Sequence, residues 1–177
     1  MEAVLARLVI LLYIAGPITI GLTMTKDWDV SDEEAECFYS ALSDELKGYD
    51  GEFSEIIRWA PEMFKLFMRL RKDPTLSDKD RKIADHVLSY FVDPDDPMPE
   101  GRIGKWGFFD DLFLCAWTLK KLEKTYGAEV LSNNWSGKAE LSKVVDETYH
   151  AGREWLSGME ETILRAAGLK PGDFKGV

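Results

Sequence analysis

After Trp28, hydrophobic side chains recur every three to four positions along most of the chain, which is the spacing of one face of an α-helix. The breaks between these periodic stretches fall at glycine, at proline or just before a serine. The pattern predicts helices over about 31–47, 52–72, 77–92, 108–126, 136–156 and 159–167, with a short turn at 128–132. The alternation that is typical of strands is absent from the sequence. We therefore expect an all-α fold, a compact bundle of five to seven helices.

Helix boundaries are marked by local signals. Ser31 with Glu34 three residues later forms a capping-box pattern, and Ser77 is placed to cap the helix that follows it. Pro61 lies inside the stretch 52–72, which predicts a kink or two shorter helices there.

The N-terminal segment 1–25 has a different character from the rest of the chain. Residues 8–25 are 18 consecutive residues without a charge, just short of the roughly 20 that cross a bilayer core. A membrane anchor and a core helix ending near Ala15 are both compatible with this length. A cleaved signal peptide fits less well, because Glu2 lies before the apolar run and no A-x-A-like site follows it. We expect a membrane-associated or cytoplasmic protein and do not expect secretion.

Composition and charge narrow the class of protein. The 177 residues are 45% hydrophobic and 31% charged, as in ordinary globular proteins. We expect one helical domain over 26–170 and an irregular tail over 171–177. The formal net charge of −10 repels phosphate backbones, so no nucleic-acid partner is expected. The basic residues between Arg58 and Lys72 indicate a solvated helix face or, alternatively, a surface for an acidic partner.

The segment 90–111 carries the most specific motif. It reads YFVDPDDPMPE and then, three residues later, GKWGFFDD. This segment resembles the YkvA-like family at Tyr90, Asp93, Pro94, Asp96, Met98, Pro99, Glu100, Gly107, Asp110 and Asp111. Pro97 departs from the family, which usually has Leu or Val there. The resemblance covers about residues 62–125. It implies a small helical domain, often found beside hydrophobic or membrane segments, with no agreed activity.

The carboxylates of this segment have a structural interpretation. Asp110 and Asp111 fall in the first turn of a predicted helix, where carboxylates accept free N–H groups and favour the positive end of the helix dipole. Asp96 and Glu100 can accept loop N–H groups as Asx-type turns do. Asp93 precedes a proline, which helps to end the preceding helix.

A cation site is the alternative interpretation of the same residues. Grouped carboxylates repel one another unless they are protonated, paired or bound to a hard cation such as Mg²⁺ or Ca²⁺. The candidate ligands are Asp93, Asp96, Glu100, Asp110 and Asp111. His86 shares a helical face with Tyr90 and is a possible general base, although a histidine at the edge of the core is the more ordinary interpretation.

No nucleotide-binding, zinc-protease or serine-hydrolase motif is present in the sequence, so no catalytic residue is assigned. Trp59, Trp117 and Trp155 fit helix faces and are expected in the core, whereas Trp106 is expected to be exposed or to pack its loop onto the core. We expect a non-enzymatic, membrane-associated interaction or scaffold module without a cofactor. It would contact a membrane through residues 8–25 and a protein partner or a second copy of itself. The alternative function is a divalent-cation-binding domain, or a metal-dependent hydrolase, that uses the loop 93–111.

Overall fold

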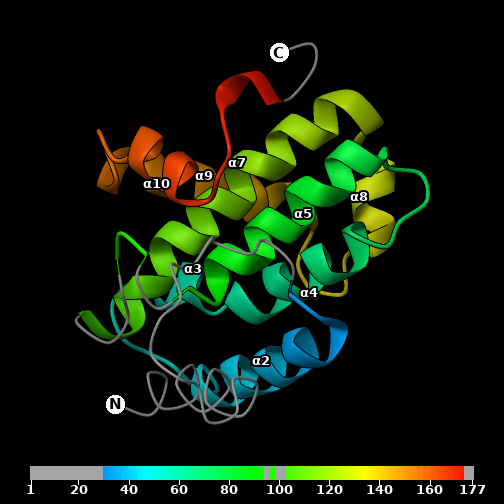
Figure 1. Cartoon of the computed structure of the whole chain (residues 1–177). Coiled ribbons are helices and arrows are strands. Elements are labelled where there is room, and N and C mark those ends of the chain that lie inside the picture. Colours follow the sequence, from blue (N-terminus) through cyan, green and yellow to red (C-terminus); the bar gives the residue numbers. More distant parts are fainter. Residues whose placement is uncertain (1–29, 94–95, 99–102, 174–177) are drawn as a thin grey trace, which may run out of the picture.

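A computed structural model describes residues 30–93, 96–98 and 103–173, and the apolar segment 8–25 lies outside these residues. All regular structure within them is helical, which confirms the predicted all-α class (Figure 1). The α-helices are α2 (Asp32–Glu45), α3 (Ser54–Ile57), α4 (Ala60–Leu70), α5 (Asp78–Phe91), α7 (Phe108–Tyr126), α8 (Ala128–Asn134), α9 (Leu141–Trp155) and α10 (Glu160–Ala166). Short 3-10 helices are η1 (Gly104–Gly107) and η2 (Pro171–Asp173). Among the described residues seven α-helices have seven residues or more, as the predicted range allows.

The local signals place most helix starts correctly. The N–H of Ser31 donates to Glu34 Oε2 at 2.6 Å and the N–H of Glu34 donates to Ser31 Oγ at 3.3 Å, so the capping box is formed. Pro61 occupies the first turn of α4, where its missing N–H costs nothing, and a break separates α4 from α3. The predicted helix 136–156 begins later than expected, at Leu141.

Helix α7 forms the centre of the fold. It has buried residues on all of its faces, and it packs against α5, α9, α8, α4 and α3 (Figure 1). The approach of α9 is especially close, because a Cβ added to Gly152 would lie 2.2 Å from the ring of Phe113. A glycine at this point of α9 is what lets the two helices pack at this separation.

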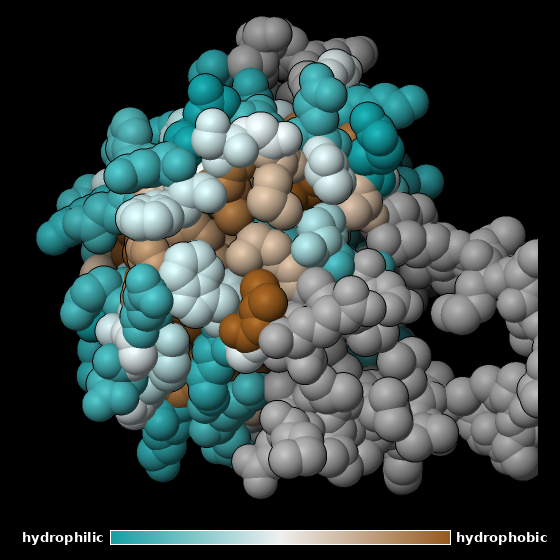
Figure 2. All heavy atoms as spheres, turned by 90° about the vertical axis from the view of Figure 1, so that its left-hand side faces the viewer, coloured by the Kyte–Doolittle hydropathy of each residue, from teal (hydrophilic) through white to brown (hydrophobic). Residues whose placement is uncertain are grey.

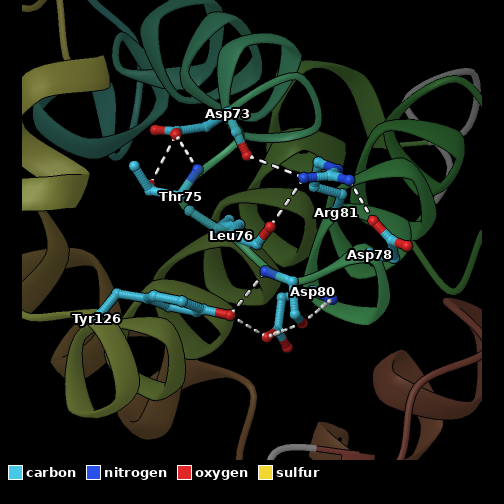
Figure 3. Close-up of polar contacts among 8 residues, drawn as sticks. Asp73, Thr75, Leu76, Asp78, Asp80, Arg81 and Tyr126 are labelled. Atoms are coloured by element: carbon cyan, nitrogen blue, oxygen red, sulfur yellow. Dashed lines mark hydrogen bonds and ion pairs between the residues drawn. The ribbon is translucent and has the colours of Figure 1, made fainter.

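A polar network fixes the beginning of α5 against the end of α7 (Figure 3). The hydroxyl of Tyr126 donates to the carboxylate of Asp80 and accepts the N–H of Ser77 at 2.9 Å. In the preceding turn the side chain of Asp73 accepts the N–H and the hydroxyl of Thr75, and these bonds lower the pKa of the Asp73 carboxyl. The turn between α4 and α5 is therefore held by its own side chains and by α7.

The basic residues of α4 mostly bind other parts of this chain. Arg71, at the end of α4, donates to the backbone carbonyl of Val30 and to Asp32, and Lys72 lies 2.6 Å from Asp32. Arg69 donates to the carbonyl of Asn134 at 2.9 Å. These contacts join α4 to the start of α2 and to α8. The Arg71 side chain is therefore buried, which differs from the expected solvated face, whereas Lys72 is exposed as expected; the alternative of a surface for an acidic partner stays a prediction.

Candidate functional site

Four residues of the motif in segment 90–111 come together in the interior, and we call them the buried carboxylate cluster: Tyr90, Asp96, Asp110 and Asp111. Tyr90 lies in the last turn of α5, and Asp110 and Asp111 lie in the first turn of α7. All three are fully buried, and Asp96, between the two helices in sequence, is 5% exposed. The antiparallel approach of α5 and α7 is what places the two ends of the motif side by side.

Two side-chain hydrogen bonds between described residues contribute to the geometry of the cluster. The hydroxyl of Tyr90 donates to Asp110 Oδ2 across the α5–α7 contact. Asp96 Oδ1 accepts the N–H of Met98 at 2.8 Å, which is the Asx-type turn expected from the sequence.

The role of Asp110 differs from the expected one. The sequence predicts a carboxylate that accepts N–H groups of its own helix, whereas this side chain accepts a hydroxyl from α5. The residue before α7 is Gly107, which has no side chain that could cap the helix, and η1 runs directly into α7. The N–H of Phe108 already donates to the carbonyls of Lys105 and Trp106, so this N–H does not need a capping carboxylate as its acceptor.

Burial and negative charge determine the protonation of Tyr90. Desolvation raises the pKa of its hydroxyl far above the usual range, and the charges of Asp110, Asp111 and Asp96 raise it further. Burial and the charge of Asp111 likewise raise the pKa of the Cys115 thiol, one turn along α7. Tyr90 therefore stays protonated and acts as a hydrogen-bond donor to the carboxylate.

The other residues of the motif have different positions. Asp93 is half-buried and its N–H donates to the carbonyl of Tyr90 at 3.1 Å, which ends α5. Gly107 is buried and directly precedes α7. Pro94, Pro99 and Glu100 lie outside the described residues.

The candidate base His86 forms a hydrogen bond with the C-terminal part of the chain. Its Nδ1 lies 2.9 Å from the carbonyl oxygen of Ala167, and the ring is half-buried, as in a histidine at the edge of the core. Within the residues that the structure describes, no group of three or more His, Cys, Asp or Glu side chains is arranged to hold a metal ion.

An aromatic cluster at the start of α7 was not anticipated from the sequence. The ring centroid of Phe53, just before α3, lies 4.4 Å from that of Trp106, 5.1 Å from that of Phe109 and 5.2 Å from that of Trp155. Ile103, at the start of η1, is 45% exposed and Trp155 is 55% exposed. We call Phe53, Ile103, Trp106, Phe109 and Trp155 the aromatic end. Figure 2 shows apolar surface in the middle of an otherwise largely hydrophilic face on this side of the molecule.

Two features of the aromatic end depart from the sequence prediction. Trp155 was expected in the core, but it is the last residue of α9 and its ring packs edge-on against Phe53 with one side open. Phe53 has a φ of 55°, the only positive φ of a non-glycine residue in the described ranges. This conformation costs about 1–3 kcal/mol and persists where surrounding contacts hold it. Neither feature has a local signal, because both depend on residues far apart in the chain.

Comparisons with known proteins add one relative. A stretch of 128 residues is 27% identical to "Uncharacterized protein ORF9" from Methanothermobacter thermautotrophicus, and covers 72% of this chain and 88% of that protein. No family model matches the chain, and no solved structure matches it.

The tyrosine of the cluster is directly testable. We expect Tyr90→Phe to lower the free energy of unfolding by about 1–3 kcal/mol, because a buried carboxylate loses its hydroxyl donor. Denaturant unfolding at neutral pH measures this change. Tyr149→Phe is the control: that ring is half-buried on Phe113 and its hydroxyl makes no hydrogen bond with the described residues. A Tyr90→Phe protein as stable as the control would show that the bond contributes nothing.

Proposed function

We propose that this protein is a non-enzymatic interaction module that attaches to a membrane through residues 8–25 and presents the aromatic end to a partner. The observation that carries the proposal is the exposure of Trp155, whose ring packs against the aromatic cluster, together with the exposure of Ile103, which comes shortly before Trp106 in the sequence. Large apolar side chains gathered on a surface mark interaction sites more often than isolated ones do.

The buried carboxylate cluster supports a non-enzymatic role. Tyr90, Asp110 and Asp111 have no exposed surface, so a dissolved substrate does not reach them in this conformation. Their contacts connect α5 with α7, which is what a stabilising element requires. The same residues carry the resemblance to the YkvA-like family, and we propose that the chain belongs to this type of helical domain.

Membrane attachment is assigned to the N-terminal segment for a physical reason. None of the helices in the described part of the chain is both long enough and apolar enough to span a bilayer. The net charge of −10 also disfavours electrostatic binding to anionic lipid. The 18 uncharged residues 8–25 are therefore the segment proposed to insert.

Vesicle flotation tests the membrane part of the proposal. We expect the full chain to float with zwitterionic phosphatidylcholine vesicles and a chain that starts at Lys26 to stay at the bottom of the gradient. Circular dichroism of the shorter chain verifies that it is folded. Equal behaviour of two folded proteins would refute attachment through 8–25, and unfolding of the shorter chain would favour a core helix instead.

The alternative function, a divalent-cation-binding domain or metal-dependent hydrolase on Asp93, Asp96, Glu100, Asp110 and Asp111, makes a different prediction. An ion at 100 times its Kd would stabilise the native state by about 2.7 kcal/mol, or several degrees in Tm. We expect the Tm with Mg²⁺ or Ca²⁺ to equal the Tm with chelator. A rise that is absent in Asp110→Asn would favour the alternative.

A further inference from the structure

We propose that the aromatic end docks a cationic, apolar peptide segment of a protein partner. The proposal rests on the function proposed above, and it adds the chemistry of the partner. Its basis is the combination of an exposed aromatic surface with an acidic border.

The acidic border lies next to the aromatic rings in the chain. Asp50 and Glu52 are exposed in the turn that leads to Phe53, and Glu154 is exposed directly before Trp155. No ion pair engages these three side chains within the part of the chain that the structure describes. They therefore present negative charge that a partner can neutralise.

Most basic residues near the aromatic end are already bound. Arg153 lies 2.6 Å from Glu160, and Arg58 lies 2.6 Å from Glu55. Lys105 donates to the backbone carbonyl of Glu45 and lies 3.7 Å from its carboxylate. Lys47, which precedes the same turn in the sequence, is exposed and can offset one of the three acidic charges. Among the residues that the structure describes, the acidic side chains around the aromatic end thus outnumber the basic side chains that are not in an ion pair.

The same negative charge acts on the hydroxyl of the neighbouring Tyr49. Its hydroxyl donates to the carbonyl of Glu52 at 2.9 Å. Partial burial raises the pKa of this hydroxyl, and the charges of Glu52 and Asp50 raise it further. The charges of Glu52 and Asp50 thus act on the Tyr49 hydroxyl even though Lys105 Nζ lies 5.8 Å from the centroid of the Tyr49 ring.

Charge also distinguishes between the molecules that could bind to the aromatic end. A second copy of this chain would bring one acidic border against another, and an anionic lipid surface would be repelled in the same way. A lysine or arginine side chain is attracted by the carboxylates and can lie over the open face of Trp155. The same kind of contact occurs within the chain, where Lys121 Nζ lies 5.3 Å from the ring centroid of Trp117. Apolar side chains of the same peptide would cover Ile103 and the rings.

Isothermal titration with two matched peptides tests the proposal. The probe is an amphipathic helical peptide of about 15 residues containing leucine, alanine and lysine, and its partner has glutamate at every lysine position. The protein is the full chain, in zwitterionic nanodiscs if flotation shows attachment and in buffer otherwise. We expect the cationic peptide to bind at least tenfold more tightly, with an affinity that falls as salt rises.

Variants locate the binding surface. Trp155→Ala and Ile103→Ser should each weaken binding at least fivefold; if the first variant fails to fold, the second carries the test. Glu154→Lys should also weaken binding of the cationic peptide. Glu129→Lys makes the same charge change at an exposed position of α8 and should leave binding unchanged.

Several results would overturn the inference. These are equal binding of the two peptides, full binding by both apolar variants, or binding of anionic vesicles in place of the cationic peptide. Binding only after removal of residues 1–25 would mean that the chain's own N-terminal segment occupies the surface. Flotation tests the anchor separately, so a chain that floats but does not distinguish the peptides refutes this inference and leaves membrane attachment standing.

Discussion

The hydrogen bond from Tyr90 to Asp110 joins the end of α5 to the beginning of α7 in the interior of the protein. Helix α7 is surrounded by other helices, so the Asp110 carboxylate in its first turn has no access to water, and a donor to a buried carboxylate offsets part of the cost of its burial. The opposite ends of the same two helices are joined by the reverse pair, in which Tyr126 of α7 donates to Asp80 of α5. Two tyrosine–aspartate bonds thus fix one antiparallel helix pair at both ends.

This fastening also determines where the aromatic end lies. Phe109 directly precedes Asp110, and Trp106 lies one turn earlier in η1. Because the bond to Asp110 fixes the first turn of α7, it also fixes the rings of Phe109 and Trp106 against Phe53. The left-handed backbone of Phe53 is retained because its ring contacts three other aromatic rings. The interior cluster joins the helix pair, and the aromatic end, which that helix pair positions, is the surface proposed for a partner.

Sequence reasoning succeeded where the signal is local. The capping box at Ser31, the break at Pro61 and the all-α class follow from spacing and backbone chemistry, and the structure confirms them. The sequence analysis placed Tyr90 and Asp110 in one motif but did not predict that their side chains meet. The hydroxyl donor for Asp110 and the exposure of Trp155 could not be predicted, since an acidic first turn is usually solvated and a tryptophan on a helix face is usually buried. Both outcomes depend on which helices surround α7, which no local pattern specifies.

A double-mutant cycle on Tyr90 and Asp110 tests the central claim most directly. Denaturant unfolding gives the free energy of unfolding for the wild type, Tyr90→Phe, Asp110→Ala and the double variant. If the bond between the hydroxyl and the carboxylate stabilises the protein, Tyr90→Phe lowers the free energy of unfolding much less in the Asp110→Ala background than in the wild type. The coupling energy is then about 1 kcal/mol or more. The same cost for Tyr90→Phe in both backgrounds would contradict the account.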